Sequence, residues 1–274
     1  ALARISNIQV VEVSTAVGVD AATSGINVAR LSSSVTTVNQ VVATNAGTAG
    51  LFTFNTGAST LNMGSGTTAV LLGAAATLAA AGTGTADSLT INRTGTAAEA
   101  VLNAKALTVS GVETITFNTG SVTNTAQNIG AIGWTPTTAN ATVTLNVTGA
   151  NVLTTGVITP AGDNLVVING SGMTAQAAGT STLITVAPVA SAAGTVSIVG
   201  SAGQDVLIGD VDSRNTITGG AGIDTITGGS ANDSLSGEAG NDSITAAAGN
   251  DTVLGGDNDD RIVFATALDL TVAD

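Results

Sequence analysis

The sequence predicts an all-β protein, in which an elongated β-solenoid or β-sandwich region is followed by a C-terminal parallel β-roll. Two observations support this prediction. A nine-residue phrase recurs seven times in succession between Gly200 and Val263, and short runs rich in Thr and Val fill residues 1–199, where no long helical period competes with them. The expected divisions are therefore a β region at 1–199, a roll at 200–263 and a tail at 264–274.

The recurring phrase follows the template Gly-Gly-x-Gly-x-Asp-x-apolar-x. The seven copies read GSAGQDVLI, GDVDSRNTIT, GGAGIDTIT, GGSANDSLS, GEAGNDSIT, AAAGNDTVL and GGDNDDRIV, and the second of them carries an extra residue. Glycines reverse the chain through backbone angles that a Cβ disfavours, and the x-apolar-x portion forms a very short strand with one side chain in the core. The acidic position holds Asp205, Asn215, Asp224, Asp233, Asp242, Asp251 and Asp260.

Stacking of the phrases should gather these carboxylates into two ladders. Two phrases make a coil of about 18 residues, and adjacent strands lie about 4.8 Å apart. Neighbouring carboxylates would then repel by roughly 1 kcal/mol in water and more in a shielded turn. A hard divalent cation such as Ca²⁺ removes this penalty and accepts carboxylate and carbonyl oxygens as ligands. One ladder should hold residues 205, 224, 242 and 260, and the other residues 215, 233 and 251.

We expect three good calcium sites and up to five in all. The good sites pair 224 with 242, 242 with 260, and 233 with 251. The rungs 205/224 and 215/233 are weaker candidates, because the second copy has an extra residue and has lost a carboxylate, for which Asp210 and Asp212 could compensate. Other copies have a different residue where the template has glycine, so some turns must be formed by residues that adopt the required backbone angles less readily than glycine does. These residues are Ala231, Glu238, Ala246, Ala247 and Asn258.

Composition excludes several classes of function. Residues 203–274 carry thirteen acidic and two basic side chains, a net charge of −11, whereas residues 1–202 carry six and four, a net of −2. No basic surface for nucleic acid exists. Without Cys or His there is no ordinary zinc site and no Ser-His or Cys-His nucleophile. We therefore do not expect an enzyme. The apolar stretch Ala69–Ala81 is too short to span a bilayer and reads as a buried strand followed by a turn.

Residues 1–199 read as a series of short strands, because β-branched runs alternate with Asn- and Gly-containing turns. Their spacing is irregular, so the sequence does not give a coil length. SNIQVVEV at 6–13 resembles SGVETITF at 110–117, which suggests two related modules with a boundary near residue 105 unless it reflects only a shared strand composition. The expected strands cover residues 8–13, 51–55, 88–92, 113–118, 142–147, 164–169, 181–186 and 195–199.

The repeats at 200–263 resemble those of RTX proteins, which are secreted by type I systems and fold on meeting external calcium. The Thr-, Ala- and Val-rich region before them is similar to RTX-containing bacterial surface-layer proteins. This resemblance implies a structural, self-assembling protein of the cell surface, secreted to the extracellular side, within a longer polypeptide. A cell-surface glycan is a further implied partner, bound through a part outside this sequence.

Two other functions stay open: a fragment of a secreted RTX adhesin or matrix fibre, and the tail of an enzyme whose catalytic domain lies elsewhere. We further expect residues 1–199 to supply most contacts between subunits, because sheet edges with few charged residues pair readily with neighbours. We expect no metal in that region, since its six carboxylates are scattered.

Overall fold

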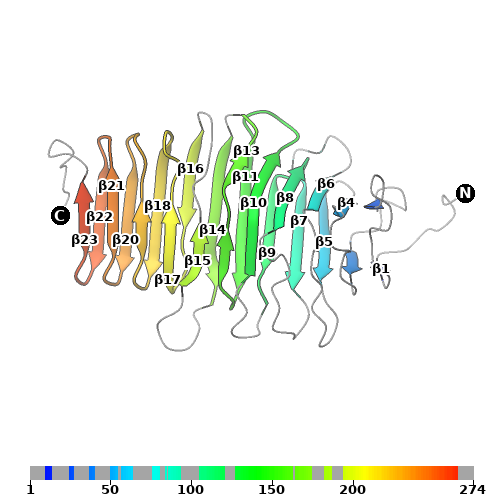
Figure 1. Ribbon diagram of the computed structural model, residues 1–274, viewed down its shortest axis with the longest axis horizontal. Helices are drawn as coiled ribbons and strands as arrows, with labels where there is room; N and C mark the ends of the chain where they lie inside the picture. Colours follow the sequence, from blue (N-terminus) through cyan, green and yellow to red (C-terminus); the bar gives the residue numbers. More distant parts are fainter. Residues whose placement is uncertain are drawn as a thin grey trace, which may run out of the picture.

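The computed structural model describes residues 10–13, 25–27, 37–40, 50–54, 57–63, 76–80, 84, 86–93, 105–120, 127–162, 164–174, 182–186 and 194–264. Within these ranges every regular element is a β-strand, and all strand pairs are parallel (Figure 1). The described part of the chain contains no helix long and apolar enough to cross a membrane. The all-β prediction is confirmed.

The strands form two sheets. The first, of eleven strands, contains β1 (Val10–Val13), β3 (Thr37–Gln40), β5 (Ala58–Met63), β7 (Ser88–Arg93), β9 (Thr114–Asn118), β11 (Thr142–Gly149), β14 (Leu165–Met173), β16 (Thr195–Val199), β18 (Arg214–Ala221), β20 (Ser234–Ala239) and β22 (Thr252–Asp257). The second, of twelve strands, contains β2 (Gly25–Asn27), β4 (Gly50–Phe54), β6 (Ala76–Ala80), β8 (Lys105–Ser110), β10 (Gln127–Thr135), β12 (Leu153–Thr155), β15 (Thr182–Val186), β17 (Gln204–Ile208), β19 (Thr225–Thr227), β21 (Ser243–Ala247) and β23 (Arg261–Phe264). Strand β13 (Ile158–Pro160) pairs with β10 beside this path.

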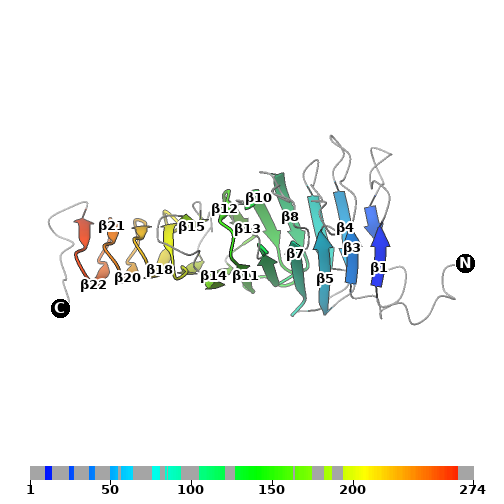
Figure 2. The ribbon, with the colours of Figure 1, turned by 90° about the horizontal axis from the view of Figure 1, so that it is seen from below.

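The chain passes back and forth between the two sheets, so one strand from each makes a coil. The coils stack into an elongated body with β1 and β23 toward opposite ends, and the sheets face each other across the core (Figure 2). A β-sandwich of antiparallel hairpins would pair strands that follow one another directly in the chain. The parallel pairing therefore favours the solenoid among the two alternatives that the sequence allowed.

Coil length changes along the body. In the roll, Ser234 pairs with Thr252 and Thr225 with Ser243, an advance of 18 residues in each case. Before the roll the advance is longer and variable: Asn62 to Asn92 spans 30 residues, and Asp87 lies 26 residues before its neighbour Glu113. Loops of unequal length absorb the difference, which is why the sequence showed no fixed coil in this region.

The eight strands expected from the sequence all coincide with observed strands, with ends that differ by a few residues. The two similar segments at 6–13 and 110–117 contain β1 and most of β9, which belong to the same sheet four coils apart. Of the apolar stretch 69–81, the described part is the strand β6 at its C-terminal end. Both sheets continue past residue 105, and the module boundary there stays a prediction.

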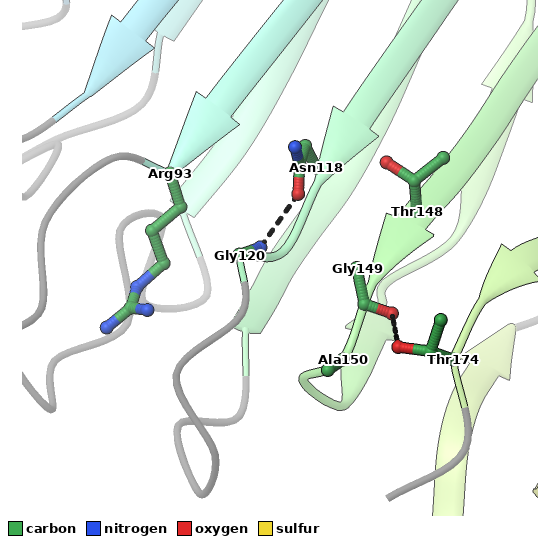
Figure 3. Close-up of a pocket in the computed structure, with 7 residues that line it drawn as sticks. All are labelled: Arg93, Asn118, Gly120, Thr148, Gly149, Ala150 and Thr174. Carbon is green, nitrogen blue, oxygen red and sulfur yellow. Dashed lines mark hydrogen bonds between the residues drawn. The ribbon is translucent and has the colours of Figure 1, made fainter.

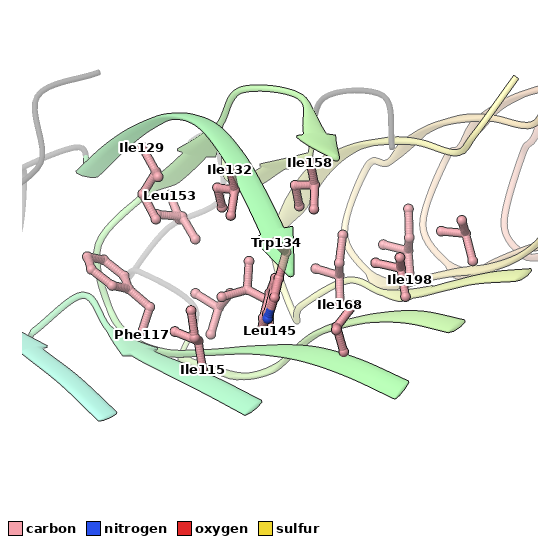
Figure 4. Packing of buried hydrophobic residues seen from close by; sticks show 14 of the residues in the cluster. Ile115, Phe117, Ile129, Ile132, Trp134, Leu145, Leu153, Ile158, Ile168 and Ile198 are labelled. Carbon is pink, nitrogen blue, oxygen red and sulfur yellow. The ribbon is translucent and has the colours of Figure 1, made fainter. Parts of the chain in front are cut away.

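Alternating side chains fill the space between the sheets, as expected for strands with one buried face. In β7 the inward residues Leu89 and Ile91 are almost fully buried, while Asn92 faces outward and donates from Nδ2 to Oδ1 of Asn62 at 2.9 Å. Figure 4 shows a part of this core in which large side chains pack between the two sheets, such as Phe117 of β9 and Trp134 of β10. There the indole Nε1 of Trp134 donates to the carbonyl oxygen of Val112 at 2.6 Å.

Candidate metal centre

The carboxylates at the acidic position of the repeats lie where the turns that join the two sheets enter a strand: Asp205 is the second residue of β17, and the later ones directly precede their strands. The turns before β17, β19, β21 and β23 pass from the first sheet to the second, whereas those before β18, β20 and β22 pass back. Alternate repeats therefore place their carboxylates at opposite edges of the roll. This arrangement agrees with the two ladders expected from the sequence.

The first ladder is built by hydrogen bonds from the backbone of one coil to the carboxylate of the next. The backbone N–H groups of Asp205, Asp224 and Asp242 donate to the Oδ1 atoms of Asp224, Asp242 and Asp260, at 2.9, 2.8 and 2.9 Å respectively. Each interior carboxylate thus bridges two coils through its own side chain and its own backbone. Asp242 is one such residue, with a complete rung on either side.

The second ladder has the same geometry at the opposite edge. The N–H group of Asn215 donates to Oδ1 of Asp233 at 2.7 Å, and that of Asp233 donates to Oδ1 of Asp251 at 2.9 Å. At the first rung, Nδ2 of Asn215 also donates to the same oxygen of Asp233 at 3.0 Å. This neutral amide supplies a donor where a second carboxylate would add repulsion, so the rung has less need of a cation.

In the irregular second repeat, hydrogen bonds of Asp210 hold the turn together. Its Oδ1 accepts the N–H groups of Asp212 and Ser213, both at 2.8 Å, and its own N–H donates to Oδ1 of Asn215 at 2.8 Å. The extra residue is therefore absorbed by a local turn, and the register of the next coil is kept. Asp210 is buried in this turn, whereas Asp212 is exposed.

The first glycine of a repeat makes room for the carboxylate of the same repeat. A Cβ at Gly219 would meet Oδ2 of Asp224 and lie 2.8 Å from the carbonyl oxygen of Gly237 in the next coil. The turns also need left-handed backbone. Glu238, Ala247 and Asn258, which replace template glycines, have φ of 76°, 71° and 83°. Ala231 and Ala246 do not adopt positive φ, so only three of the five replacements carry the backbone angle that glycine favours.

Burial makes the ladder carboxylates costly to ionise without a partner charge. Asp224 is fully buried and Asp242 is 2 % exposed, and the Oδ2 atom of each is buried without a hydrogen-bond donor. Burial, together with the charges of Asp205 and Asp242, raises the pKa of Asp224 to about 7. Burial, with a contribution from Asp260, also raises the pKa of Asp242. Arg214 and Arg261, the two basic residues of the roll, are exposed.

The oxygen atoms of the ladders are suitable ligands for Ca²⁺. Buried carboxylate oxygens without N–H partners lie beside close-packed turns whose carbonyl oxygens point at the neighbouring coil, and calcium accepts both kinds of oxygen. Among the described residues, no three acidic, His or Cys side chains converge closely enough to hold one metal ion by themselves. Any ion at a rung would therefore need backbone carbonyls or water to complete a shell of six to eight oxygens.

The fold and this edge geometry define a parallel β-roll with stacked acidic turns. Residues 211–244 and 239–264 match the family model of the RTX calcium-binding nonapeptide repeat, which describes four copies. The C-terminal part of the chain is thus an RTX repeat region, and its repeats bind calcium. The same hydrogen-bond pattern extends back to Asp205, before the matched residues. Neither the comparison with curated proteins nor that with solved structures found a match.

A separate recess lies at the C-terminal ends of β7, β9, β11 and β14, which are adjacent strands of the first sheet. It has a volume of about 330 Å³ and is lined by Arg93, Asn118, Gly120, Thr148, Gly149, Ala150 and Thr174 (Figure 3). Burial lowers the pKa of Arg93. Backbone and threonine groups across the recess bond to one another: Oγ1 of Thr174 donates to the carbonyl oxygen of Gly149 at 3.4 Å. The sequence held no motif for this feature, because its residues come from four different coils.

Proposed function

We propose that this protein is a structural, self-assembling component of the extracellular surface, of the surface-layer type, whose roll folds and becomes rigid when calcium binds. The residues that would hold calcium are those of the two ladders. They are Asp205, Asn215, Asp224, Asp233, Asp242, Asp251 and Asp260. The chain itself carries out no catalysis in this proposal.

The observation that carries the proposal is the continuity of the two sheets. Strands β14, β16 and β18 pair in succession, as do β15, β17 and β19, so the roll grows directly out of the preceding coils. A change in the order of the roll would therefore act directly on the strands of the preceding coils, with which the roll shares both sheets. A calcium-dependent segment built in this way suits a stiff structural subunit.

Calcium binding would also make the roll fold only outside the cell. In a calcium-poor cytosol, the buried carboxylates of the ladders repel one another and keep the roll unfolded, which suits export by a type I system. Extracellular calcium modules bind at roughly 10⁻⁴–10⁻³ M, so the external ion concentration would complete the roll after export. RTX repeats are typical of proteins secreted in this way.

An alternative function is that of a secreted RTX adhesin or matrix fibre. The outward face of the first sheet favours this alternative, because it carries two regular polar rows. Thr60, Thr90 and Thr116 stack in register, and Asn62, Asn92 and Asn118 stack beside them. Such a regular polar face could contact a surface without forming a lattice. The structural reading needs contacts between copies, which we assign mainly to residues 1–199.

Electron microscopy of the purified protein with millimolar calcium and with excess EGTA tests the proposal. Ordered sheets or filaments that form only with calcium would support the structural function. Dispersed rods in calcium, at every concentration tested, would contradict self-assembly and favour the adhesin. A variant with Asp224→Asn and Asp242→Asn is the matched control, because it removes two ladder charges together with their repulsion, so its assembly should depend less on calcium than that of the parent.

A further inference from the structure

A pair of buried carboxylates outside the repeats reproduces the ladder geometry of the roll. Asp87 precedes β7 and Glu113 precedes β9, and they are 3 % and 6 % exposed. The N–H group of Asp87 donates to Oε2 of Glu113 at 2.8 Å, and Oδ1 of Asp87 accepts the N–H group of Gly57 from the coil before. This is the pattern of a backbone donor in one coil and a carboxylate in the next that builds the calcium ladders.

The pair occupies the same register position as the second ladder. Ser88 pairs with Thr114 in β9, so Asp87 and Glu113 are aligned across adjacent strands. Following the pairing through the first sheet leads from this position to three buried valines and then to the ladder of the roll. The complete row is Gly57, Asp87, Glu113, Val143, Val166, Val196, Asn215, Asp233 and Asp251.

One oxygen of this pair has no donor. Oδ2 of Asp87 is buried and accepts no hydrogen bond from the described residues, and it lies beside Gly84, where a Cβ would lie 2.5 Å away. The Oε1 atom of Glu113, in contrast, accepts the N–H group of Thr137 at 3.0 Å. The nearest basic residue along the strand, Arg93, lies at the far end of β7, about 20 Å away at 3.3 Å per residue. Two adjacent buried carboxylates therefore share a site in which one oxygen has no positive partner among the residues that the structure describes.

We propose that Asp87 and Glu113 bind a calcium ion outside the RTX repeats, with the Oδ2 atom of Asp87 as a ligand. A hard cation accepts anionic oxygens of this kind and removes their mutual repulsion. The site would clamp the coils of β5, β7 and β9 in the same way that the ladders clamp the roll. It replaces the expectation that residues 1–199 hold no metal, and it does not depend on how the protein assembles.

The single tryptophan provides a selective probe, because Trp134 bonds to the carbonyl oxygen of Val112, the residue next to Glu113. Terbium is a hard trivalent ion that occupies calcium sites and emits when a nearby indole is excited. The nearest rung of the roll, at Asn215, lies four strands beyond β9, about 19 Å away at the usual strand spacing. Trp-excited emission from the full chain therefore reports mainly on the proposed site, whereas direct excitation reports on all bound terbium.

We expect Trp-excited terbium emission that calcium competes away. Asp87→Asn or Glu113→Gln should weaken terbium binding at this site on the order of a hundredfold, since each removes one of two buried charges. Asp233→Asn, which removes a charge from the same row in the roll, should leave the Trp-excited signal unchanged. The emission maximum of Trp134 shows whether each variant is folded.

Two results would overturn the site. One is full Trp-excited emission in folded Asp87→Asn and Glu113→Gln proteins. The other is an absence of such emission in the parent protein when direct excitation shows that the roll is loaded with terbium. If a variant fails to fold, the parent protein still decides the question by this second comparison.

Discussion

At the scale of the residue, the ladder carboxylates combine a structural and a binding role. The Oδ1 atom of Asp224 or Asp242 accepts a backbone N–H group from the previous coil, while Oδ2 is buried without a donor. At position 215 the ladder has a neutral Asn, whose Oδ1 accepts the N–H group of Asp210 in its own turn and whose backbone N–H donates to Asp233. The retention of a buried charge at most other rungs is understandable if a cation offsets it.

Asp242→Ala should be the most damaging substitution of a single acidic residue. Asp242 has complete rungs to both Asp224 and Asp260, so its loss should remove ligands from two ions, whereas Asp260→Ala should affect one. Calorimetric titration with calcium would measure the number of ions bound by each variant. An equal loss of ions from the two variants would contradict the ladder assignment. Asp242→Asn separates the lost charge from the lost packing.

Calcium binding should depend on pH near neutrality. The unfolded chain releases the proton of Asp224 near pH 4, whereas the folded, calcium-free roll holds it up to about pH 7. The calcium-free roll is therefore most stable at low pH and loses stability as the pH rises from about 4 to 7. Calcium must displace this proton, so its affinity should fall as the pH drops below about 7. Titrations at pH 6 and 8 would test this, and equal affinities would argue against protonation of the ladder.

At the scale of the element, each turn of the roll depends on the absence of side chains where coils meet. Gly240 has a φ of 142°, and a Cβ there would collide with the carbonyl oxygen of Gly222 in the coil before. Gly162 also has positive φ, at 78°, but a Cβ there would meet nothing within 4 Å. The two positions therefore separate backbone strain from a clash between coils.

Gly240→Ala should destabilise the calcium-loaded protein much more than Gly162→Ala, for which backbone strain alone costs about 1–2 kcal/mol. Thermal unfolding in calcium would compare them. If both variants lose the same stability, then the turns are not packed as closely as the structure indicates. Gly240→Ala should also lower calcium affinity, because its turn precedes Asp242.

The elements differ in how far the sequence could predict them. In the roll, an advance of 18 residues per coil, or 19 across the irregular second repeat, determines which carboxylates stack, so both ladders were predictable down to the residue. In the earlier coils, strands such as β7 and β9 were predictable from their alternation, but their register was not. The alignment of Asp87 with Glu113 depends on loops that make coils of 30 and then 26 residues. Nothing in the sequence around either residue reveals their proximity.

At the scale of the whole molecule, the protein is a single stack of coils, and its two parts are stabilised by different interactions. The wider coils contain the large buried side chains, including Trp134 and Phe117, and hold together by apolar burial. In the roll, each short strand contributes little more than one apolar side chain, such as Ile226 or Ile244. The roll has too small a core to offset its buried charges, and we infer that calcium supplies the difference.

Hydrogen–deuterium exchange of the full chain, in calcium and after exhaustive chelation with EGTA, tests this claim most directly. We predict that the amides of residues 205–260 are protected in calcium and lose protection together in EGTA, while the core strands β9 to β14 stay protected. Restored calcium should restore the protection. If the roll keeps the same protection without calcium, then its acidic ladders are stable by themselves and calcium-dependent folding is wrong.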